Sequence, residues 1–312
     1  MNSEIFLIVL PVFLVIGLGF SLKKTGLVNS EFLFNLNRLI YYIALPALLF
    51  YKIATANFFV SFNGPLLACL IVSVLIIFFI SYGYGSFREY RPSVHGAFCQ
   101  GAFRGNLAYV GLAIVYSAYG EEGFAVAGIL LGFLVPLFNF LSVVALILPQ
   151  RRDSYHMDTF FLVKQIVYNP LIVASFGGVL WSFLTLPLPL IVDRAFEIVT
   201  GMSLPLALIA IGASFSFRKL RGDLALAALS ACLKIVILPA LTGGILILIG
   251  VRGQELGIGV LLAGSPTATA AYIMAQQLKS DAELSGAIIM LSTLCSLATY
   301  TFALYLLQVL GI

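Results

Sequence analysis

The sequence predicts an all-α membrane protein of ten transmembrane helices, built as two inverted repeats of five helices. Composition, the spacing of apolar segments and the distribution of basic residues predict this class. Hydrophobic residues make up 61% of the 312 residues and charged residues only 10%, whereas a soluble domain carries about a quarter charged residues. This composition places the chain in a lipid bilayer and gives no indication of a nucleic-acid partner.

Apolar segments of membrane-spanning length follow one another along the whole chain. About 20 apolar residues cross the hydrocarbon core as a helix, and the connections between these segments are short. The first segment lacks a small-residue cleavage site, so we expect it to remain as a span. The ten predicted spans are 5–22, 33–56, 64–86, 93–117, 123–148, 161–184, 190–215, 223–250, 255–277 and 284–310.

The basic residues alternate between loops, and this alternation predicts the orientation. Ten lie in the loops after odd-numbered spans and three in the loops after even-numbered spans. Because cytoplasmic loops carry the excess of lysine and arginine, we expect a multi-pass protein of the plasma membrane, the inner membrane in bacteria, with both termini outside. The ten are Lys23, Lys24, Arg88, Arg91, Arg151, Arg152, Arg218, Lys219, Arg221 and Lys279, and the three are Lys52, Arg194 and Arg252.

Two pairs of similar segments indicate an internal duplication. The pair Leu45-Pro46 recurs as Leu204-Pro205, 159 residues later. The segment 101–109 aligns with 264–272 at an offset of 163, with glycine and tyrosine at matching ends. We therefore expect two halves, residues 1–150 and 151–312. Because each half holds five spans, the second must enter the membrane upside down, as in many alternating-access transporters.

Residues that interrupt helices lie near the middle of the fourth and ninth predicted spans. At 1.5 Å per residue, Arg104 lies ~16 Å from one membrane face and Thr267 ~18 Å from the other. The core is roughly 30 Å thick, so both positions are near its centre. Unwound backbone is tolerated there only where protein buries it or where it lines a cavity. We therefore expect two broken helices that cross, and the interrupting residues are Gly105, Gly111, Gly264 and Pro266.

Arg104 is the most informative residue of the predicted crossing. A charged side chain at the bilayer centre costs at least ~2.5–3.5 kcal/mol on insertion scales, so it needs a partner or a polar cavity. In one interpretation the guanidinium group binds the carboxylate of a substrate, which its fork geometry suits. In the other it holds the unwound carbonyl groups of the broken helices.

Other polar residues near the breaks are candidates for the same site. Lys234, ~16 Å into the eighth span, supplies a second positive charge or bonds the carbonyl groups from behind. For the neutral side chains, hydrogen bonds between helices are about as probable as ligand contacts. Asn139 and Ser142 are expected to hydrogen-bond a neighbouring helix. The candidate substrate-binding residues are Arg104, Asn106, Tyr109, Lys234, Pro266, Thr267, Thr269, Tyr272 and Gln276.

The sequence leaves the energy source of transport open. All thirteen acidic residues lie in loops or near span ends, although ion-coupled carriers often keep a carboxylate at the midplane. Glu197 and His95 are the candidates for a coupling role. Sodium bound by carbonyl and hydroxyl oxygens also remains open. No other cofactor and no metal centre is expected, and no enzymatic motif is present, because the two histidines are far apart and no phosphate-binding loop occurs.

A set of segments, in order along nearly the whole chain, resembles the bacterial branch of the auxin efflux carrier family. The segments are Leu10–Gly19, Lys23–Leu27, Leu39–Phe50, Arg104–Leu112, Asn139–Val143, Tyr168–Leu171, Leu208–Ser214, Lys234–Pro239, Pro266–Ala268 and Tyr272–Ala275.

The resemblance implies ten helices, inverted repeats and a crossing of helices 4 and 9, as in sodium/proton-antiporter-like and bile-acid-symporter-like folds. It also implies transport of organic anions, which are auxin in plants and dicarboxylates such as malate or malonate in bacteria. One position departs from the family pattern, because the family commonly has Gly-Leu-Pro in the fourth helix and this chain has Gly111-Leu112-Ala113. The break in the fourth span is therefore expected to depend on glycines and bound polar groups.

The main hypothesis is a secondary active or facilitative transporter of small carboxylates, working by alternating access. One helix bundle would carry the crossing, and the other would serve as a scaffold or a homodimer contact. The alternative is a membrane sensor that binds a ligand on the same fold without net transport. An intramembrane enzyme is the third and weakest hypothesis.

Overall fold

The computed structural model describes residues 2–56, 62–153, 168–215 and 223–309. Across these ranges the chain forms helices, and the described backbone contains no β-strand, only one isolated antiparallel bridge. The predicted all-α class is therefore confirmed. Part of the sixth predicted span and the loop before the eighth lie outside the described residues.

Seven helical segments of the described chain are long and apolar enough to cross a membrane. Two further helices are apolar but shorter, namely Pro170–Phe183 and Gly253–Ala263. The chain is thus a multi-pass membrane protein. The count of ten spans and the inverted repeat remain predictions.

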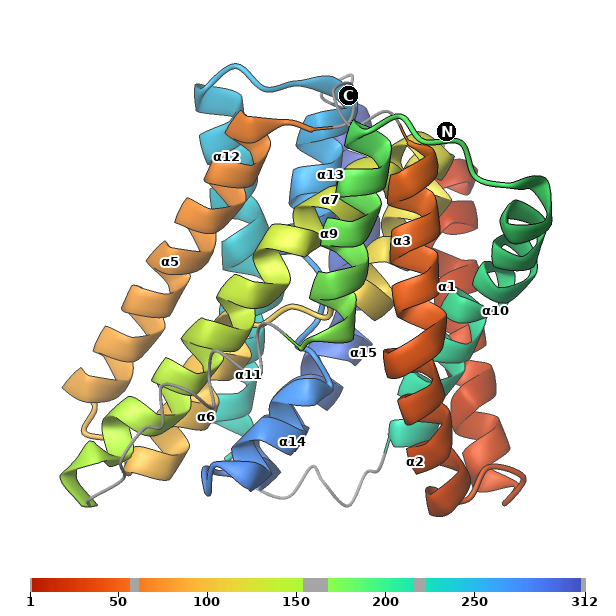
Figure 1. Cartoon of the computed structure of the whole chain (residues 1–312). Coiled ribbons are helices and arrows are strands. Elements are labelled where there is room, and N and C mark those ends of the chain that lie inside the picture. Colours follow the sequence, from red (N-terminus) through yellow and green to blue (C-terminus); the bar gives the residue numbers. More distant parts are fainter. Residues whose placement is uncertain (1, 57–61, 154–167, 216–222, 310–312) are drawn as a thin grey trace. The chain divides into compact units, whose positions relative to one another are not determined.

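The first of two compact units consists of residues 1–63, 108–136 and 164–215. Its helices are drawn in red to orange, yellow and green in Figure 1. They are α1 (Asn2–Lys24), α2 (Ser30–Leu39), the π turn η1 (Ile40–Ala44), α3 (Leu45–Thr55), α9 (Pro170–Phe183), α10 (Leu190–Ser214) and the first part of α7 (Leu112–Ile147). In α7 the backbone leaves the helical conformation at Gly120, which has φ 60° and ψ −151°. Two helices meet there, at the loop that the sequence predicts.

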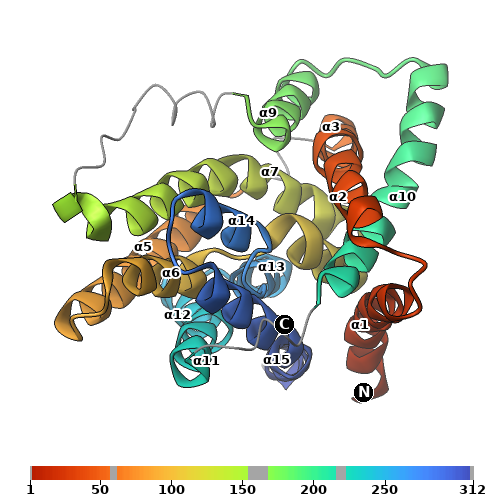
Figure 2. The same cartoon turned by 90° about the horizontal axis from the view of Figure 1, so that it is seen from below.

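Helices α1 and α10 pack with their backbones in contact, and two glycines make this possible. A Cβ atom at Gly19 would overlap the Ile209 carbonyl group, and one at Gly212 would overlap the carbonyl oxygen of Ile16. Small residues allow membrane helices to approach this closely, where van der Waals packing provides the association energy. The two helices lie side by side in Figure 1 and Figure 2.

The second unit consists of residues 64–107, 137–163 and 216–312. Its helices are α5 (Gly64–Phe87), α6 (Pro92–Phe103), the last part of α7, the 3₁₀ turn η3 (Leu148–Asp153), α11 (Leu224–Cys232), the π turn η5 (Leu233–Ile237), α12 (Leu238–Leu248), α13 (Gly253–Ala263), α14 (Ala270–Gln277) and α15 (Ala282–Val309). Each unit is assembled from three chain segments. A unit is therefore different from a sequence half, and the predicted halves 1–150 and 151–312 remain a prediction about duplication.

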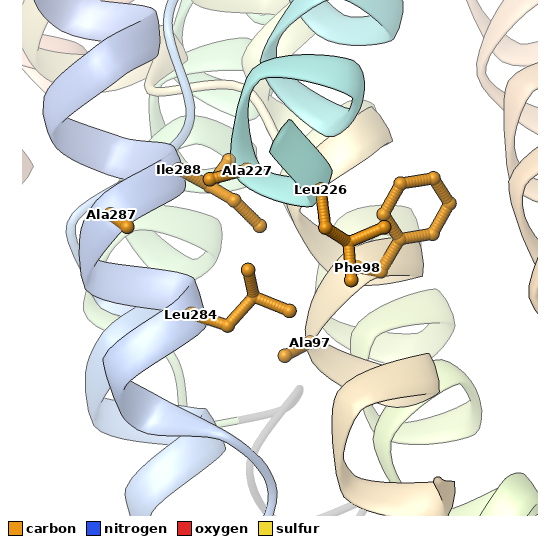
Figure 3. Close-up of a cluster of buried hydrophobic side chains, with 7 residues drawn as sticks. All are labelled: Ala97, Phe98, Leu226, Ala227, Leu284, Ala287 and Ile288. Atoms are coloured by element: carbon orange, nitrogen blue, oxygen red, sulfur yellow. The ribbon is translucent and has the colours of Figure 1, made fainter. Parts of the chain in front are cut away.

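A buried apolar cluster joins three helices of the second unit. Figure 3 shows the side chains of α6, α11 and α15 that form it. Because α6 leads directly into the polar segment at residue 104, this cluster fixes the position of that segment against two other helices. The members are Ala97, Phe98, Leu226, Ala227, Leu284, Ala287 and Ile288.

Two of the helices contain a π turn directly before a proline. The turn η1 precedes Pro46, and η5 precedes Pro239. Proline lacks an N–H group and its ring collides with the carbonyl four residues earlier, so a widened turn removes both conflicts. Pro205 differs, because it lies inside the uninterrupted helix α10. The two Leu-Pro segments that the sequence pairs thus differ in local conformation, although Ser203 Oγ donates a hydrogen bond of 2.8 Å to Ala44 O.

The contact of α1 with α10 generates a stability prediction. The variant Gly212→Ala should unfold at a lower temperature than the unchanged protein, because the new methyl group must displace the α1 backbone, at about 1–3 kcal/mol. Gly17→Ala on α1 is the matched control, since a Cβ atom there meets nothing within 4 Å. Thermal unfolding in detergent measures both, and equal midpoints for the two variants would contradict the close packing.

Candidate functional site

The two breaks predicted from the sequence are present near the middle of the second unit. Helix α6 ends at Phe103, and the chain continues through residues 104–106 into the π turn η2 (Leu107–Gly111) and α7. Helix α13 ends at Ala263, and α14 begins at Ala270. Gly105 lies in the first break and Gly264 caps α13, whereas Gly111 ends the π turn that follows the first break.

The two breaks pair with each other. Asn106 N donates to Pro266 O at 2.7 Å, and Ala268 N donates to Arg104 O at 2.9 Å. These bonds enclose an antiparallel bridge between Gly105 and Thr267. Backbone groups in a membrane must find partners within the protein, and each break supplies them to the other. The missing proline at Ala113 is therefore not needed, because that residue lies in α7, beyond the break.

Side chains form hydrogen bonds with further backbone groups around the bridge. Thr267 Oγ1 donates to Gly101 O at 2.9 Å, which satisfies a carbonyl group near the end of α6. Thr267 N donates to Ser292 Oγ of α15 at 3.0 Å. Ser230 Oγ of α11 donates to Phe98 O at 2.9 Å. The crossing is thus held by α11 and α15 as well as by its own backbone.

Arg104 is buried, with 8% of its surface exposed, and its guanidinium group bonds the last part of α7. Nη1 donates to Phe138 O at 3.0 Å and to Ser142 Oγ at 2.7 Å, and Nη2 donates to Asn139 Oδ1 at 2.8 Å. The hydrogen bonds predicted for Asn139 and Ser142 are confirmed, with Arg104 as their common partner. Arg104 therefore ties the crossing to α7, and its role in binding a carboxylate stays a prediction.

Lys234 lies in η5 with 1% of its surface exposed. Its Nζ atom donates to Ala263 O, the last carbonyl of α13, at 2.5 Å. A Cβ atom placed on Gly105 would lie 3.3 Å from the same Nζ atom. Lys234 thus lies close to both breaks. It bonds a carbonyl group at a helix end, which is the second of the two roles that the sequence leaves open for it.

The remaining candidates differ in how close they lie to the bridge. Asn106 is 7% exposed, and its side-chain amide has no hydrogen bond to another described residue. Thr269 and Tyr272 are half-buried at the start of α14, and Gln276 is exposed near its end. Tyr109 is half-buried in η2 and belongs to the first unit, where it lies near Tyr41.

The two coupling candidates lie at other places. His95 Nε2 donates to Tyr82 O at 2.9 Å, and the two rings pack with centroids 4.6 Å apart. These contacts fasten α6 to α5, about 13 Å along the helix from Arg104. Glu197 is exposed on α10 in the first unit.

The electrostatics of the crossing favour an anion. Two helices, η2–α7 and α14, begin at the breaks, and helix N-termini carry a partial positive charge. Arg104 and Lys234 add two buried basic side chains. No acidic residue occurs in 92–120, 224–251, 256–280 or 284–312, which include the segments that form or contact the bridge. The site therefore has an excess of positive charge that a bound carboxylate would balance.

Comparison with known proteins agrees with a role in membrane transport. A family model described as "Membrane transport protein" matches residues 4–304. The chain belongs to this family, the auxin efflux carriers. It is a membrane transport protein, and neither the family nor the names of its relatives indicate an enzyme.

Three relatives of this auxin efflux carrier family member cover almost its full length. It is 28% identical to "Putative malonate transporter" of Rhizobium meliloti, over 98% of this chain and 97% of the relative. It is 26% identical to an "Uncharacterized transporter" of Methanothermobacter thermautotrophicus, over 93% and 94% of the two chains. An "Uncharacterized transporter" of Methanocaldococcus jannaschii is 21% identical over the same shares.

The three hydrogen bonds of Arg104 generate the second prediction. Arg104→Lys keeps the charge but loses the fork, so it should lower the unfolding temperature, because each bond from a charged donor is worth about 1.5–3 kcal/mol. Asn139→Ala should cost less in an Arg104→Lys background than in the unchanged protein. A double-mutant cycle of thermal stabilities measures the difference, and strictly additive effects would show that the two side chains do not interact.

Proposed function

We propose that the protein is a secondary active or facilitative transporter that moves small organic anions across the plasma membrane by alternating access. The substrates are carboxylates such as malate, malonate or auxin-like acids. The observation that carries this proposal is the paired break, where two helix N-termini and two buried basic side chains meet without an acidic residue in the surrounding segments. Half-helix N-termini that point at an anionic substrate are a recurring feature of transporters.

Asn106 and Thr269 are the proposed neutral contacts of the carboxylate. Each lies at the beginning of a half-helix, where backbone N–H groups lack partners within the helix. The Asn106 amide makes no bond to other described residues, and Thr269 is half-buried. Arg104 supplies positive charge from the side of α7, and Tyr272 and Gln276 extend the proposed contact surface. The name of the Rhizobium meliloti relative supports a carboxylate as the substrate.

We further propose ten spans in two inverted halves. The bridge supports this arrangement, because its partners Gly105 and Thr267 are 162 residues apart, within one residue of the offset of 163 at which the sequence aligns the two segments. The contact between Ala44 and Ser203 joins residues 159 apart, which is the offset of the two Leu-Pro segments. Residues related by an internal two-fold axis contact each other where the axis passes between them.

Alternating access then follows from the topology. In transporters with inverted repeats, one bundle rocks or shifts against the other around a fixed site near the midplane. The second unit holds the crossing together with α5, α11, α12 and α15, and we propose that it carries the substrate. Both termini are proposed to lie outside, from the distribution of basic residues.

The carboxylate site generates the third prediction. Malonate and malate should raise the unfolding temperature of the purified protein. Uncharged diamides of the same size should not, because the diamides lack the negative charge that balances the positive charge of the site. Asn106→Ala should weaken malonate binding about tenfold, the effect of losing about 1.4 kcal/mol. Gln277→Ala, at an exposed position on α14, is the control and should leave the affinity unchanged.

Uptake of labelled malonate into proteoliposomes separates the candidate functions. Uptake that other carboxylates inhibit supports a transporter, and binding without uptake would indicate a ligand-binding sensor. An Asn106→Ala protein with unchanged affinity would contradict the proposed position of the site.

A further inference from the structure

The two half-helices that end at the crossing each have a carbonyl group at or near the end that accepts a hydrogen bond from a side chain, and the two donors differ in chemistry. Gly101 O of α6 accepts a hydrogen bond from the hydroxyl group of Thr267. Ala263 O of α13 accepts one from the ammonium group of Lys234. Gly101 and Ala263 are 162 residues apart, the offset of the bridge, so they are equivalent positions. One end is bonded by a hydroxyl group and the other by the basic amino group of a lysine.

The reason for this difference lies at Gly105. The residue equivalent to Thr267 at the offset of 162 is Gly105, which faces Thr267 in the bridge and has no side chain. A Cβ atom on Gly105 would lie 3.1 Å from Lys234 Cε and 3.3 Å from Lys234 Nζ, and it would overlap Ser265 Oγ. Ser265 Oγ and the Lys234 side chain therefore together fill the space that a threonine side chain would occupy.

The surroundings of the Lys234 ammonium group are those of a cation site. The carbonyl end of a helix carries a partial negative charge, and in transporters such ends and unwound carbonyl groups coordinate the coupling cation. Two hydroxyl oxygens, Ser265 Oγ and Tyr300 OH, are buried and have no hydrogen-bond partner among the described residues. Ser265 lies beside Gly105, and the Tyr300 ring lies 3.6 Å from a Cβ atom placed on Gly264.

We propose that the Lys234 ammonium group is a tethered cation that takes the place of a bound metal cation at the carbonyl end of α13. A lysine ammonium group has one full charge and three donors, so it meets the needs of this end without an ion from solution. A second monovalent cation at the same carbonyl group would be repelled at contact distance. The crossing therefore needs no sodium ion at this position, and the tethered charge also faces the proposed substrate anion. In this last respect the inference rests on the proposed function.

The first test uses the unchanged protein. Its unfolding temperature in detergent should be the same in sodium, potassium and N-methylglucamine chloride at equal ionic strength. A stabilisation specific to sodium would overturn the proposal.

The second test removes the tether. Lys234→Ala should lower the unfolding temperature by about 4 °C or more, since each kcal/mol shifts a chain of this size by roughly 2–4 °C. Ethylammonium chloride should then restore part of the loss in this variant and have no such effect on the unchanged protein. Lys52→Ala is the control, because Lys52 forms a surface ion pair with Glu121 at 2.6 Å; ethylammonium should not rescue it. Failure of ethylammonium to stabilise a folded Lys234→Ala protein would also overturn the proposal.

The third test replaces the Lys234 amino group by a hydroxyl group at residue 105, which corresponds to the Thr267 hydroxyl group in the other half of the chain. Gly105→Ser in the unchanged protein should be destabilising, because its Cβ atom meets Lys234 and Ser265. In the Lys234→Ala background the same change should cost less stability, because only the overlap with Ser265 Oγ remains. An equal or larger loss of stability in that background would count against the exchange. If Lys234→Ala does not fold alone, the first test on the unchanged protein decides.

These measurements need no substrate. Sodium-insensitive stability and ethylammonium rescue in a protein that binds no carboxylate would overturn the proposed function and leave the tethered cation standing. Carboxylate binding together with sodium-specific stabilisation would do the reverse.

Discussion

The structure depends on the need to satisfy backbone N–H and C=O groups at the centre of a membrane. Each unsatisfied group there costs several kcal/mol, and the unwound segments 104–106 and 266–268 are expected at this depth from the sequence. They pair with each other, Ser292 accepts a further bond from Thr267 N, and the Thr267 and Lys234 side chains bond carbonyl groups of the adjoining helix ends. The helix ends that this pairing brings together create the electrostatic properties of the site.

At the crossing, the carbonyl ends and the N–H ends of the helices have different surroundings. Near the ends of α6 and α13, carbonyl groups accept hydrogen bonds from a hydroxyl group and a lysine amino group, and we propose that a ligand binds at the beginnings of the helices that follow. Arg104 donates to three acceptors on α7, so its charge is fixed in place. An anion that enters such a site meets donors that are already oriented, which lowers the reorganisation cost of binding.

The sequence predicted the helical class, the two breaks and their polar residues, because glycine, proline and charged residues inside apolar spans are local signals. It did not predict partners that depend on the rotation of neighbouring helices. Nothing local shows that Arg104 bonds Asn139 and Ser142, or that Thr267 N is met by Ser292. The spacing of Ser285, Ser292 and Ser296 along α15 was a usable signal, since these positions share a helix face. The π turns before Pro46 and Pro239 required the backbone itself.

The mutual pairing of the breaks has a consequence for biosynthesis. The ribosome delivers residues 104–106 to the membrane long before residues 266–268 emerge, so the first break enters the bilayer without the strand that completes it. Neither half of the chain can satisfy the backbone groups of its own break. The last steps of assembly must therefore join both halves at once, and a chain truncated before Pro266 would retain open backbone groups at the membrane centre, the type of lesion that membrane quality control recognises.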